Sequence, residues 1–242
     1  MPSRANVRSM PGHTHFDESN EEYLEAIYRL DREGPGVSNS SIASELGVAP
    51  ASVSGMLKKL AVDGYIEHQA RGGAKLTEKG LQTAVRVVRR NRLAEVFLTE
   101  ILGLPWDKVY EEACRLEHAI SALVEERLVE VLGDPKFCPH GHPIPPADLS
   151  EPAYAGIPVA QLETGSTARL HSVTEQMTEM LRYLTEIGLA RGTTLKIVEK
   201  APLGGPITIE YDGRRQPISL ELAKQLTAVD VDGPAATERR TA

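Results

Sequence analysis

Proline limits the possible folds of this chain more than any other residue type. Seven prolines lie between Gly133 and Pro158 in a sequence of 242 residues. Proline has no backbone N–H to donate, and its ring clashes with the preceding helical turn, so such a stretch forms neither a helix nor a central strand. We therefore predict a linker over residues 135–158. Helical periodicity dominates before this linker and short strands follow it, which indicates an α+β chain built of separate domains.

The composition is that of a globular protein, with 41% hydrophobic and 25% charged residues. No apolar run approaches the roughly 20 residues of a membrane span, and the polar first residues contain no export signal. Two cysteines are too few for a disulfide framework and suit a reducing compartment. We therefore expect a cytoplasmic protein with no membrane contact. The net charge of −7 arises after residue 95, so it does not exclude DNA binding by the first part of the chain.

A helix-turn-helix pattern lies in the first third of the chain. Either Ser38 or Asn39 can cap a short helix over residues 40–46, Gly47 begins a tight turn, and Pro50 suits the start of a second helix that runs to about Val62. The second helix of such a motif lies in the major groove of DNA. We expect Ser38 and the exposed residues of the second helix to contact DNA: Ala51, Ser52, Ser54, Gly55, Lys58 and Lys59. A helical hairpin without DNA-binding function is the alternative.

Two short strands are expected next, over residues 64–68 and 74–77, and Arg71 lies at the tip between them. A hairpin directly after a recognition helix forms the wing of a winged helix, whose tip contacts phosphate or the minor groove. We therefore predict a winged helix-turn-helix domain over residues 17–80, with Arg71 as a further DNA-binding residue. The helix that follows carries four arginines that either are solvated or reach phosphate: Arg86, Arg89, Arg90 and Arg92.

One stretch beyond this helix joins a thiol, a carboxylate and an imidazole. Cys114, Glu117 and His118 are spaced i, i+3 and i+4, and a helix would place them on one face. A thiolate, a carboxylate and a neutral imidazole are suitable ligands for a divalent transition metal. Such triplets also occur on ordinary helices, where a buried Cys lies beside a surface Glu and His.

The linker holds a second group of this kind. Cys138 is followed by His140 and His142, so another thiol stands beside two imidazoles. The alternative interpretation is a polar loop that carries these residues without binding a metal.

After residue 160 the pattern changes to short strands separated by one helix and by turn glycines. This pattern is typical of a small SH3-like barrel. The expected strands cover residues 168–173, 194–198, 207–211 and 217–220, and the helix covers residues 175–187.

A winged helix, the sequence Glu-Ala-Cys-Arg-Leu-Glu-His at residues 112–118 and an SH3-like barrel occur in this order. In this succession the chain resembles the diphtheria toxin repressor and manganese transport regulator family over about residues 17–231. The resemblance implies a cytoplasmic homodimer that binds operator DNA when loaded with Mn²⁺ or Fe²⁺ and represses metal-uptake genes. Because the two recognition helices of a dimer lie about one DNA turn apart, we expect a pseudo-palindromic operator.

The resemblance and the periodicity together divide the chain into six segments. These are a disordered tail (1–16), the winged helix-turn-helix domain (17–80), a helical dimerisation and metal-binding domain (81–134), the proline-rich linker (135–158), an SH3-like, iron-transport-A-like (FeoA-type) domain (159–231) and a second disordered tail (232–242).

Two metal sites per subunit are implied by the same resemblance. The primary site would take its ligands from the first helix and from the Cys-Glu-His helix: Glu22, Glu25, Cys114, Glu117 and His118. The secondary site would combine the long helix, the loop and the barrel: Glu95, Cys138, His140 and Glu179. Asn91 and Tyr110 stand where the family often has histidines, so their roles, like that of His142, stay open.

The expected metal is Mn²⁺, with Fe²⁺ as the alternative. Iron-type members carry a methionine at the position of Glu22, and a hard carboxylate favours Mn²⁺. Cys114 favours Fe²⁺, since manganese-type members often have Glu there. An ion bound by Glu22 and the Cys114 helix would join the DNA-binding domain to the dimerisation domain and select the orientation that fits DNA.

Two other functions are possible from the residues alone. An enzyme could use Cys114 as a nucleophile and His118 as its base, but no oxyanion hole, third orienting group or substrate cleft accompanies them, so we expect no enzyme. A winged-helix regulator could instead sense oxidants through Cys114 and Cys138, in which case the thiols would control DNA binding.

Overall fold

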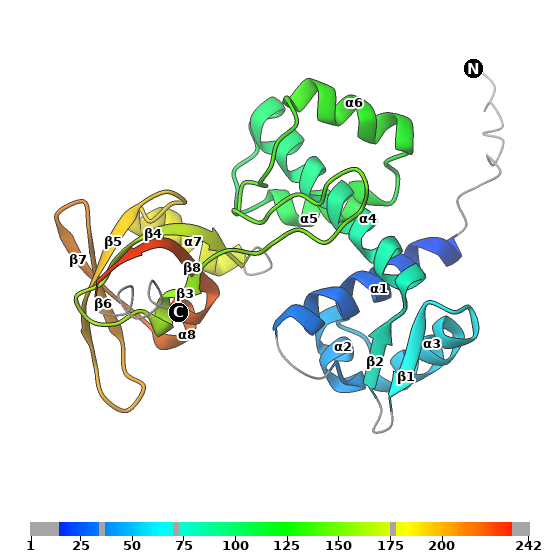
Figure 1. The fold of residues 1–242 in the computed structure, drawn as a ribbon, viewed down its shortest axis with the longest axis horizontal. Helices are drawn as coiled ribbons and strands as arrows, with labels where there is room; N and C mark the ends of the chain where they lie inside the picture. Colours follow the sequence, from blue (N-terminus) through cyan, green and yellow to red (C-terminus); the bar gives the residue numbers. More distant parts are fainter. Residues whose placement is uncertain (1–14, 34–36, 70–72, 175–177, 234–242) are drawn as a thin grey trace, which may run out of the picture. The chain divides into compact units, whose positions relative to one another are not determined.

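The computed structural model describes residues 15–33, 37–69, 73–174 and 178–233 (Figure 1). These residues form two compact units. The first contains the chain up to Val88 and the segment Ala147–Ser150, and the second contains Arg89–Pro146 and the chain from Glu151 onward. The first helix begins at His15 and the last strand ends at Asp232. Residues 15–16 and 232, which are expected to belong to the disordered tails, are therefore part of a helix and a strand. The rest of both tails lies outside the described residues.

The first unit is a helix-turn-helix followed by a two-stranded hairpin. Its elements are α1 (His15–Glu33), α2 (Asn39–Leu46), α3 (Pro50–Val62), β1 (Ile66–Gln69), β2 (Gly73–Leu76) and the first part of α4 (Glu78–Val96). Ser38 and Ser41 form a capping box at α2, Gly47 is left-handed with a φ of 63°, and Pro50 opens α3. The predicted helix-turn-helix is therefore confirmed. Its core includes the fully buried side chains of Leu24, Ile27, Ile42, Leu57 and Leu60.

The hairpin is antiparallel, with Ile66 opposite Leu76, and each strand is shifted by a residue or two from its expected bounds. Arg71, at the expected tip, lies outside the described residues. The start of α4 passes very close to the chain that enters the hairpin: a Cβ added at Gly80 would lie 2.0 Å from the carbonyl oxygen of Tyr65. Only glycine permits this approach.

The helical part of the second unit contains the rest of α4, a π-helical turn (Phe97–Ile101), α5 (Val109–Glu117) and α6 (Ala122–Leu132). The sequence predicts one regular helix to about Leu102, but the α-helix ends at Val96. The hydroxyl of Thr99 donates to the carbonyl oxygen of Glu95 at 2.8 Å, and a bond of this kind competes with the regular backbone ladder.

The proline-rich segment is more ordered than a spacer. Phe137 and Pro143 form an isolated β-bridge, and the N–H of Cys138 donates to the carbonyl oxygen of His142 at 2.9 Å. These residues therefore form a tight loop. Ile157–Pro158 forms β3 at the edge of a sheet, where a proline without an N–H is tolerated. The end of the predicted linker thus belongs to the domain that follows it.

Six antiparallel strands form the C-terminal sheet, in the order β3-β8-β4-β5-β6-β7 (Figure 1). Besides β3, the elements are a 3₁₀ turn (Val159–Gln161), β4 (Thr167–Val173), α7 (Thr178–Ile187), β5 (Thr194–Lys200), β6 (Ile207–Tyr211), β7 (Arg214–Ile218), α8 (Leu220–Gln225) and β8 (Leu226–Asp232). Leu170 of β4 and Ile209 of β6 are buried together with Leu181 of α7. Strand β8 has no counterpart among the predicted strands, and the first three residues of the helix predicted over 175–187 lie outside the described residues. None of the described helices has the length and apolar character of a membrane span.

We expect Gly80→Ala to lower the free energy of unfolding by about 1–3 kcal/mol, because its Cβ would collide with the main chain at Tyr65. Gly55→Ala in α3 is the matched control: no atom lies within 4 Å of its Cβ position, so it should stabilise the protein by roughly 0.5–1 kcal/mol. Urea denaturation of the full chain measures both. Equal stability of Gly80→Ala and the wild type would contradict the close approach of α4.

Candidate metal centres and DNA-binding surface

Three buried donor side chains meet in the second unit. Glu95 comes from the last turn of α4, and Cys138 and His140 come from the proline-rich loop. One ligand atom from each lies within 4.8 Å of the others, and all three side chains are buried. Nδ1 of His140 lies 3.2 Å from Oε1 of Glu95. A carboxylate, a thiol and an imidazole this close together form a donor set for a divalent transition metal.

The surroundings of these donors fit a cation. Among the described residues, no hydrogen bond reaches either carboxylate oxygen of Glu95, although the residue is only 1% exposed. A buried carboxylate without donors is costly unless a positive charge compensates for it. Nε2 of His140 must donate to the carbonyl oxygen of Trp106, 2.8 Å away, because a carbonyl only accepts. In the neutral ring, Nδ1 therefore carries the lone pair on the side of Glu95, as a metal ligand requires.

The loop is held against β4 by one main-chain hydrogen bond and one side-chain contact. The N–H of Val173 donates to the carbonyl oxygen of His140 at 2.9 Å, and Nε2 of His142 lies 3.0 Å from the carbonyl oxygen of Val173. Gly141 has a φ of 91°, and a Cβ there would lie 2.0 Å from the carbonyl oxygen of His171, so glycine is required. Burial is the main cause that lowers the pKa of His171. This imidazole is therefore neutral near pH 7 and places no charge beside the loop.

The predicted primary ligands fall into two groups, one in each unit. Cys114, Glu117 and His118 lie on α5 and at its C-cap, so the expected helix is present. Glu117 is 2% exposed, and its Oε1 lies 3.2 Å from Nε2 of His118. The side-chain N–H of Asn91 donates to Sγ of Cys114 at 3.6 Å. Asn91 therefore contacts a candidate ligand, as a supporting outer group would.

Glu22 and Glu25 lie on α1 in the first unit. Glu22 is exposed, whereas Glu25 is buried and forms an ion pair with Arg29 at 2.7 Å. This pair is absent from the sequence predictions, although a Glu and an Arg at i, i+4 on a helix are the usual signal for it. Glu25 thus has a partner within its own helix.

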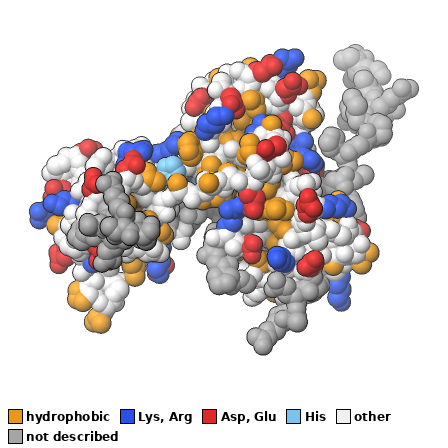
Figure 2. All heavy atoms as spheres, in the orientation of Figure 1, with side chains coloured by type: hydrophobic (Ala, Val, Ile, Leu, Met, Phe, Trp, Pro, Cys, Tyr) orange, Lys and Arg blue, Asp and Glu red, His pale blue; other side chains and the backbone are white. Residues whose placement is uncertain are grey.

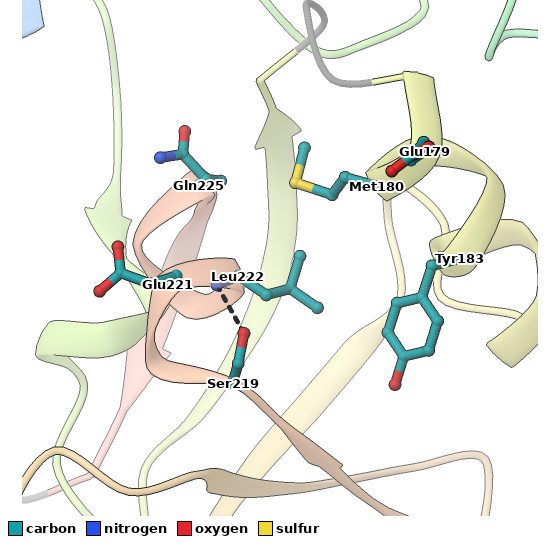
Figure 3. A pocket seen from close by; sticks show the side chains of 7 residues that line it. All are labelled: Glu179, Met180, Tyr183, Ser219, Glu221, Leu222 and Gln225. Atoms are coloured by element: carbon teal, nitrogen blue, oxygen red, sulfur yellow. Dashed lines mark hydrogen bonds between the residues drawn. The ribbon is translucent and has the colours of Figure 1, made fainter.

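Glu179 is not part of the buried donor group, contrary to its expected place in the secondary site. It is exposed at the start of α7. There it lines a separate pocket of about 510 Å³ with Met180, Tyr183, Ser219, Glu221, Leu222 and Gln225. Figure 3 shows these side chains, from α7 and from the segment that forms α8. The face of α7 that carries Glu179 therefore borders this pocket, and within the described part of the chain the buried group consists of three donors.

Part of the expected DNA-contacting surface of α3 is exposed. Asn39 donates to the hydroxyl of Ser54 at 3.0 Å, and Lys59 donates to the side-chain carbonyl of Asn20 at 2.8 Å. These contacts brace α3 against its neighbouring helices, and no local sequence pattern signals them. The exposed residues of the expected set are Ala51, Ser52, Gly55 and Lys58.

The arginines of α4 mostly bind other protein groups. Arg89 and Arg90 both donate to the carboxylate of Glu125 on α6, at 2.7 and 3.2 Å. Arg92 donates to the carbonyl oxygen of Pro143 in the loop at 2.6 Å. Arg86 is exposed. Among these four arginines, only Arg86 therefore remains a candidate for contact with DNA phosphate.

Three family models match consecutive parts of the chain. The N-terminal DNA-binding domain of iron-dependent repressors matches residues 15–74, their metal-binding and dimerisation domain matches residues 77–146, and the FeoA domain matches residues 157–229. The diphtheria toxin repressor of Corynebacterium glutamicum is 31% identical over 226 residues, which cover 89% of this chain and 98% of that protein. The chain belongs to the diphtheria toxin repressor family of metal-dependent repressors.

Relatives in the diphtheria toxin repressor family carry both iron and manganese in their names. The iron-dependent repressor IdeR of Mycobacterium tuberculosis is 41% identical over 128 residues, which cover 53% of this chain and 56% of that protein. A manganese-dependent transcriptional repressor solved with manganese has a TM-score of 0.83 at 31% identity, with 87% of this chain and 99% of that chain covered. The manganese regulator SloR has a TM-score of 0.77 at 32% identity, with 87% and 97% covered.

Membership of the diphtheria toxin repressor family confirms the coarse functional predictions. The first unit contains a DNA-binding domain, the helices that follow are a metal-binding and dimerisation domain, and the C-terminal sheet is a FeoA domain with an SH3-like fold. The α+β prediction is thereby confirmed. Proteins of this family are transcriptional repressors and not enzymes, so Cys114 is not a catalytic nucleophile.

In metal-free protein, we expect Glu95→Gln to leave the free energy of unfolding unchanged or to raise it by up to about 2 kcal/mol. The reason is that a neutral amide is less costly to bury than a carboxylate that receives no hydrogen bond. The thermal stabilisation that added Zn²⁺ gives the wild type should decrease. Melting curves in EDTA and in Zn²⁺ measure both effects, and Glu126→Gln, at an exposed position of α6, is the control. A strongly destabilised metal-free Glu95→Gln that keeps its zinc response would instead indicate a structural ion pair.

Proposed function

We propose that this chain is a manganese-responsive repressor. In this proposal it acts in the cytoplasm as a homodimer, binds a pseudo-palindromic operator when loaded with metal, and represses metal-uptake genes. The observation that supports it best is the buried group of Glu95, Cys138 and His140 in a chain that also has a DNA-binding domain. A donor set of this composition is costly to bury without a cation and has no use in DNA binding itself.

The proposal includes two metal sites per subunit, one for each donor set. The secondary site uses Glu95, Cys138 and His140. The primary site uses the α5 donors together with two carboxylates of α1: Cys114, Glu117, His118, Glu22 and Glu25. A bound divalent cation supplies the positive charge that lets these acids and the thiolate be held together.

The residues of the primary site couple metal binding to DNA binding. Glu22 and Glu25 belong to the DNA-binding domain, whereas Cys114, Glu117 and His118 belong to the dimerisation domain. Without a cation the carboxylates repel one another and disfavour the joined arrangement. A coupling of ~100-fold between metal and operator requires a difference of only about 2.7 kcal/mol between the two arrangements.

Manganese is the preferred metal in this proposal because Glu22, Glu25, Glu95 and Glu117 supply hard carboxylate oxygens. Iron(II) is the second candidate, favoured by a specific observation: each donor set contains one cysteine, Cys114 or Cys138, and thiolates favour softer ions than Mn²⁺.

The homodimer is supported by apolar side chains exposed on the helices of the dimerisation domain. They include Ile101, Leu102, Leu116, Leu123, Val124 and Val131. Figure 2 shows orange side chains among the charged ones over this part of the molecule. Surface residues of this kind are buried when two copies associate. Two copies also present two recognition helices, which suits an operator with two-fold symmetry.

We expect Mn²⁺ to tighten operator binding about 100-fold, and we expect Glu22→Ala and His118→Ala to abolish this response because each removes a primary ligand. Gel-shift titrations with Mn²⁺ and with EDTA measure it, and light scattering checks that both variants are still dimers. Glu126→Ala serves as the control. Equal operator affinity of the wild type in Mn²⁺ and EDTA would refute metal control, and a monomeric His118→Ala would show that this residue supports the dimer.

We also expect the two lysines of α3 to differ. Lys58 is exposed, so Lys58→Ala should reduce the slope of log K against log salt by about one unit, as the loss of one phosphate contact does. Lys59 donates to Asn20, so Lys59→Ala should change this slope less and lower the stability of the first unit. Fluorescence anisotropy with operator DNA at several salt concentrations measures the slopes. Equal slopes for the two variants would contradict the assignment.

A further inference from the structure

We propose that Trp106 is a positioning residue through which the FeoA domain controls the metal-ligating form of His140. This inference rests on the secondary site of the proposed function and adds a regulation of that site. Trp106 is the only tryptophan of the chain and lies between the π-helical turn and α5, outside every predicted site.

Trp106 fixes both the tautomer and the plane of His140. Its carbonyl oxygen lies 2.8 Å from Nε2 of His140 and can only accept, so Nε2 carries a proton, and in the neutral ring the lone pair is on Nδ1. The two rings are stacked, with centroids 5.8 Å apart and an interplanar angle of 23°. The stacking limits rotation of the His140 imidazole about its Cβ–Cγ bond. Nδ1 is thereby kept 3.2 Å from the carboxylate of Glu95.

The same tryptophan is attached to α7 of the FeoA domain. Its indole Nε1 donates to Oγ1 of Thr185 at 2.8 Å, and the hydroxyl of Thr185 donates onward to the carbonyl oxygen of Leu181. The next residue, Asp107, forms an ion pair with Arg182 at 3.2 Å. Trp106 and Asp107 are therefore fixed to two successive turns of α7.

The main chain of His140 is held by the same domain. Its carbonyl oxygen accepts a hydrogen bond from the N–H of Val173 at 2.9 Å, and Gly141 has no Cβ because the main chain at His171 occupies that space. The ring of His140 is thus linked to α7 through Trp106, and its backbone is linked to β4 directly. When the FeoA domain is seated, both links orient Nδ1 toward Glu95 and Cys138.

Coupling of this kind is reciprocal. If seating of the FeoA domain raises the affinity of the secondary site for metal, metal binding must favour the seated domain by the same factor. The FeoA domain then acts on this site without supplying a ligand, in agreement with the exposed position of Glu179 outside the buried donor group. The alternative is that Trp106 only packs against the core of the FeoA domain and that its contact with His140 has no effect on metal binding.

The test uses Thr185→Val in the full-length chain, which removes the acceptor for the indole N–H and keeps the shape of the side chain. Thr194→Val, an exposed threonine of β5 in the same domain, is the matched control. Both are made in a Cys114→Ser background, so that Cys138 is the only thiol. The probe is Co²⁺, whose thiolate charge-transfer band reports Cys138 and whose binding quenches the fluorescence of Trp106.

We expect Thr185→Val to weaken Co²⁺ binding about threefold to tenfold, the range of one lost hydrogen bond, and Thr194→Val to leave it unchanged. In metal-free protein, ¹⁵N spectra of His140 should show the proton on Nε2. Hydrogen exchange of α7 should be faster in Thr185→Val, and Co²⁺ should slow it in the Thr194→Val control.

Three outcomes overturn the inference, and they are distinguishable. A proton on Nδ1 of metal-free His140 removes the role of the Trp106 carbonyl. Equal Co²⁺ affinity of the two threonine variants, with a normal Cys138 band, rejects the coupling and leaves the secondary site intact. Absence of any Cys138 band in the Thr194→Val control rejects the secondary site itself, and the inference fails with it.

Discussion

The hydrogen bond from Nε2 of His140 to the carbonyl oxygen of Trp106 is the contact on which the buried donor group depends. Glu95 is placed by α4, a regular helix whose backbone hydrogen bonds fix the direction of its side chains. His140 comes from a segment rich in proline, where no regular ladder fixes the side chains. The single acceptor at Trp106 therefore decides which ring nitrogen faces the carboxylate, and hence whether the three side chains form a donor set or only a buried cluster.

Glu95 shows what this arrangement costs. Its carboxylate is buried and receives no hydrogen bond from the described residues, and replacing such a group by an apolar side chain of similar size commonly stabilises a protein. Departures from local stability rules are expected at functional sites. By contrast, Glu125 is also partly buried but accepts from Arg89 and Arg90, as a structural carboxylate does. The two acids therefore differ in their partners: Glu125 has two arginines, and Glu95 lies among candidate metal ligands.

The sequence predicts elements whose signals are local. The cap at Ser38, the left-handed Gly47 and the alternation in β6 all act within a few residues, and these elements are observed close to their expected bounds. The π-helical turn after Val96 and strand β8 depend on tertiary contacts, so they escape prediction. The same limit applies to the sites: the helical spacing of Cys114, Glu117 and His118 is visible in the sequence, but the approach of His140 to Glu95 is not.

The charges of the DNA-binding unit illustrate why orientation matters for this repressor. Lys59 and Ser54 form hydrogen bonds with neighbouring helices. The residues exposed near the start of α3 are therefore small ones: Ala51, Ser52 and Gly55. Small residues can contact thymine methyl groups and can follow the shape of the groove. They cannot form the bidentate hydrogen bonds to bases that would give a single helix high affinity. In the proposed homodimer, binding depends on two recognition helices docking at the same time. The second helix gains affinity from the first only if the geometry allows both to reach the DNA. A metal ion that fixes the orientation of the DNA-binding domains can therefore control occupancy of the operator without contacting the DNA bases.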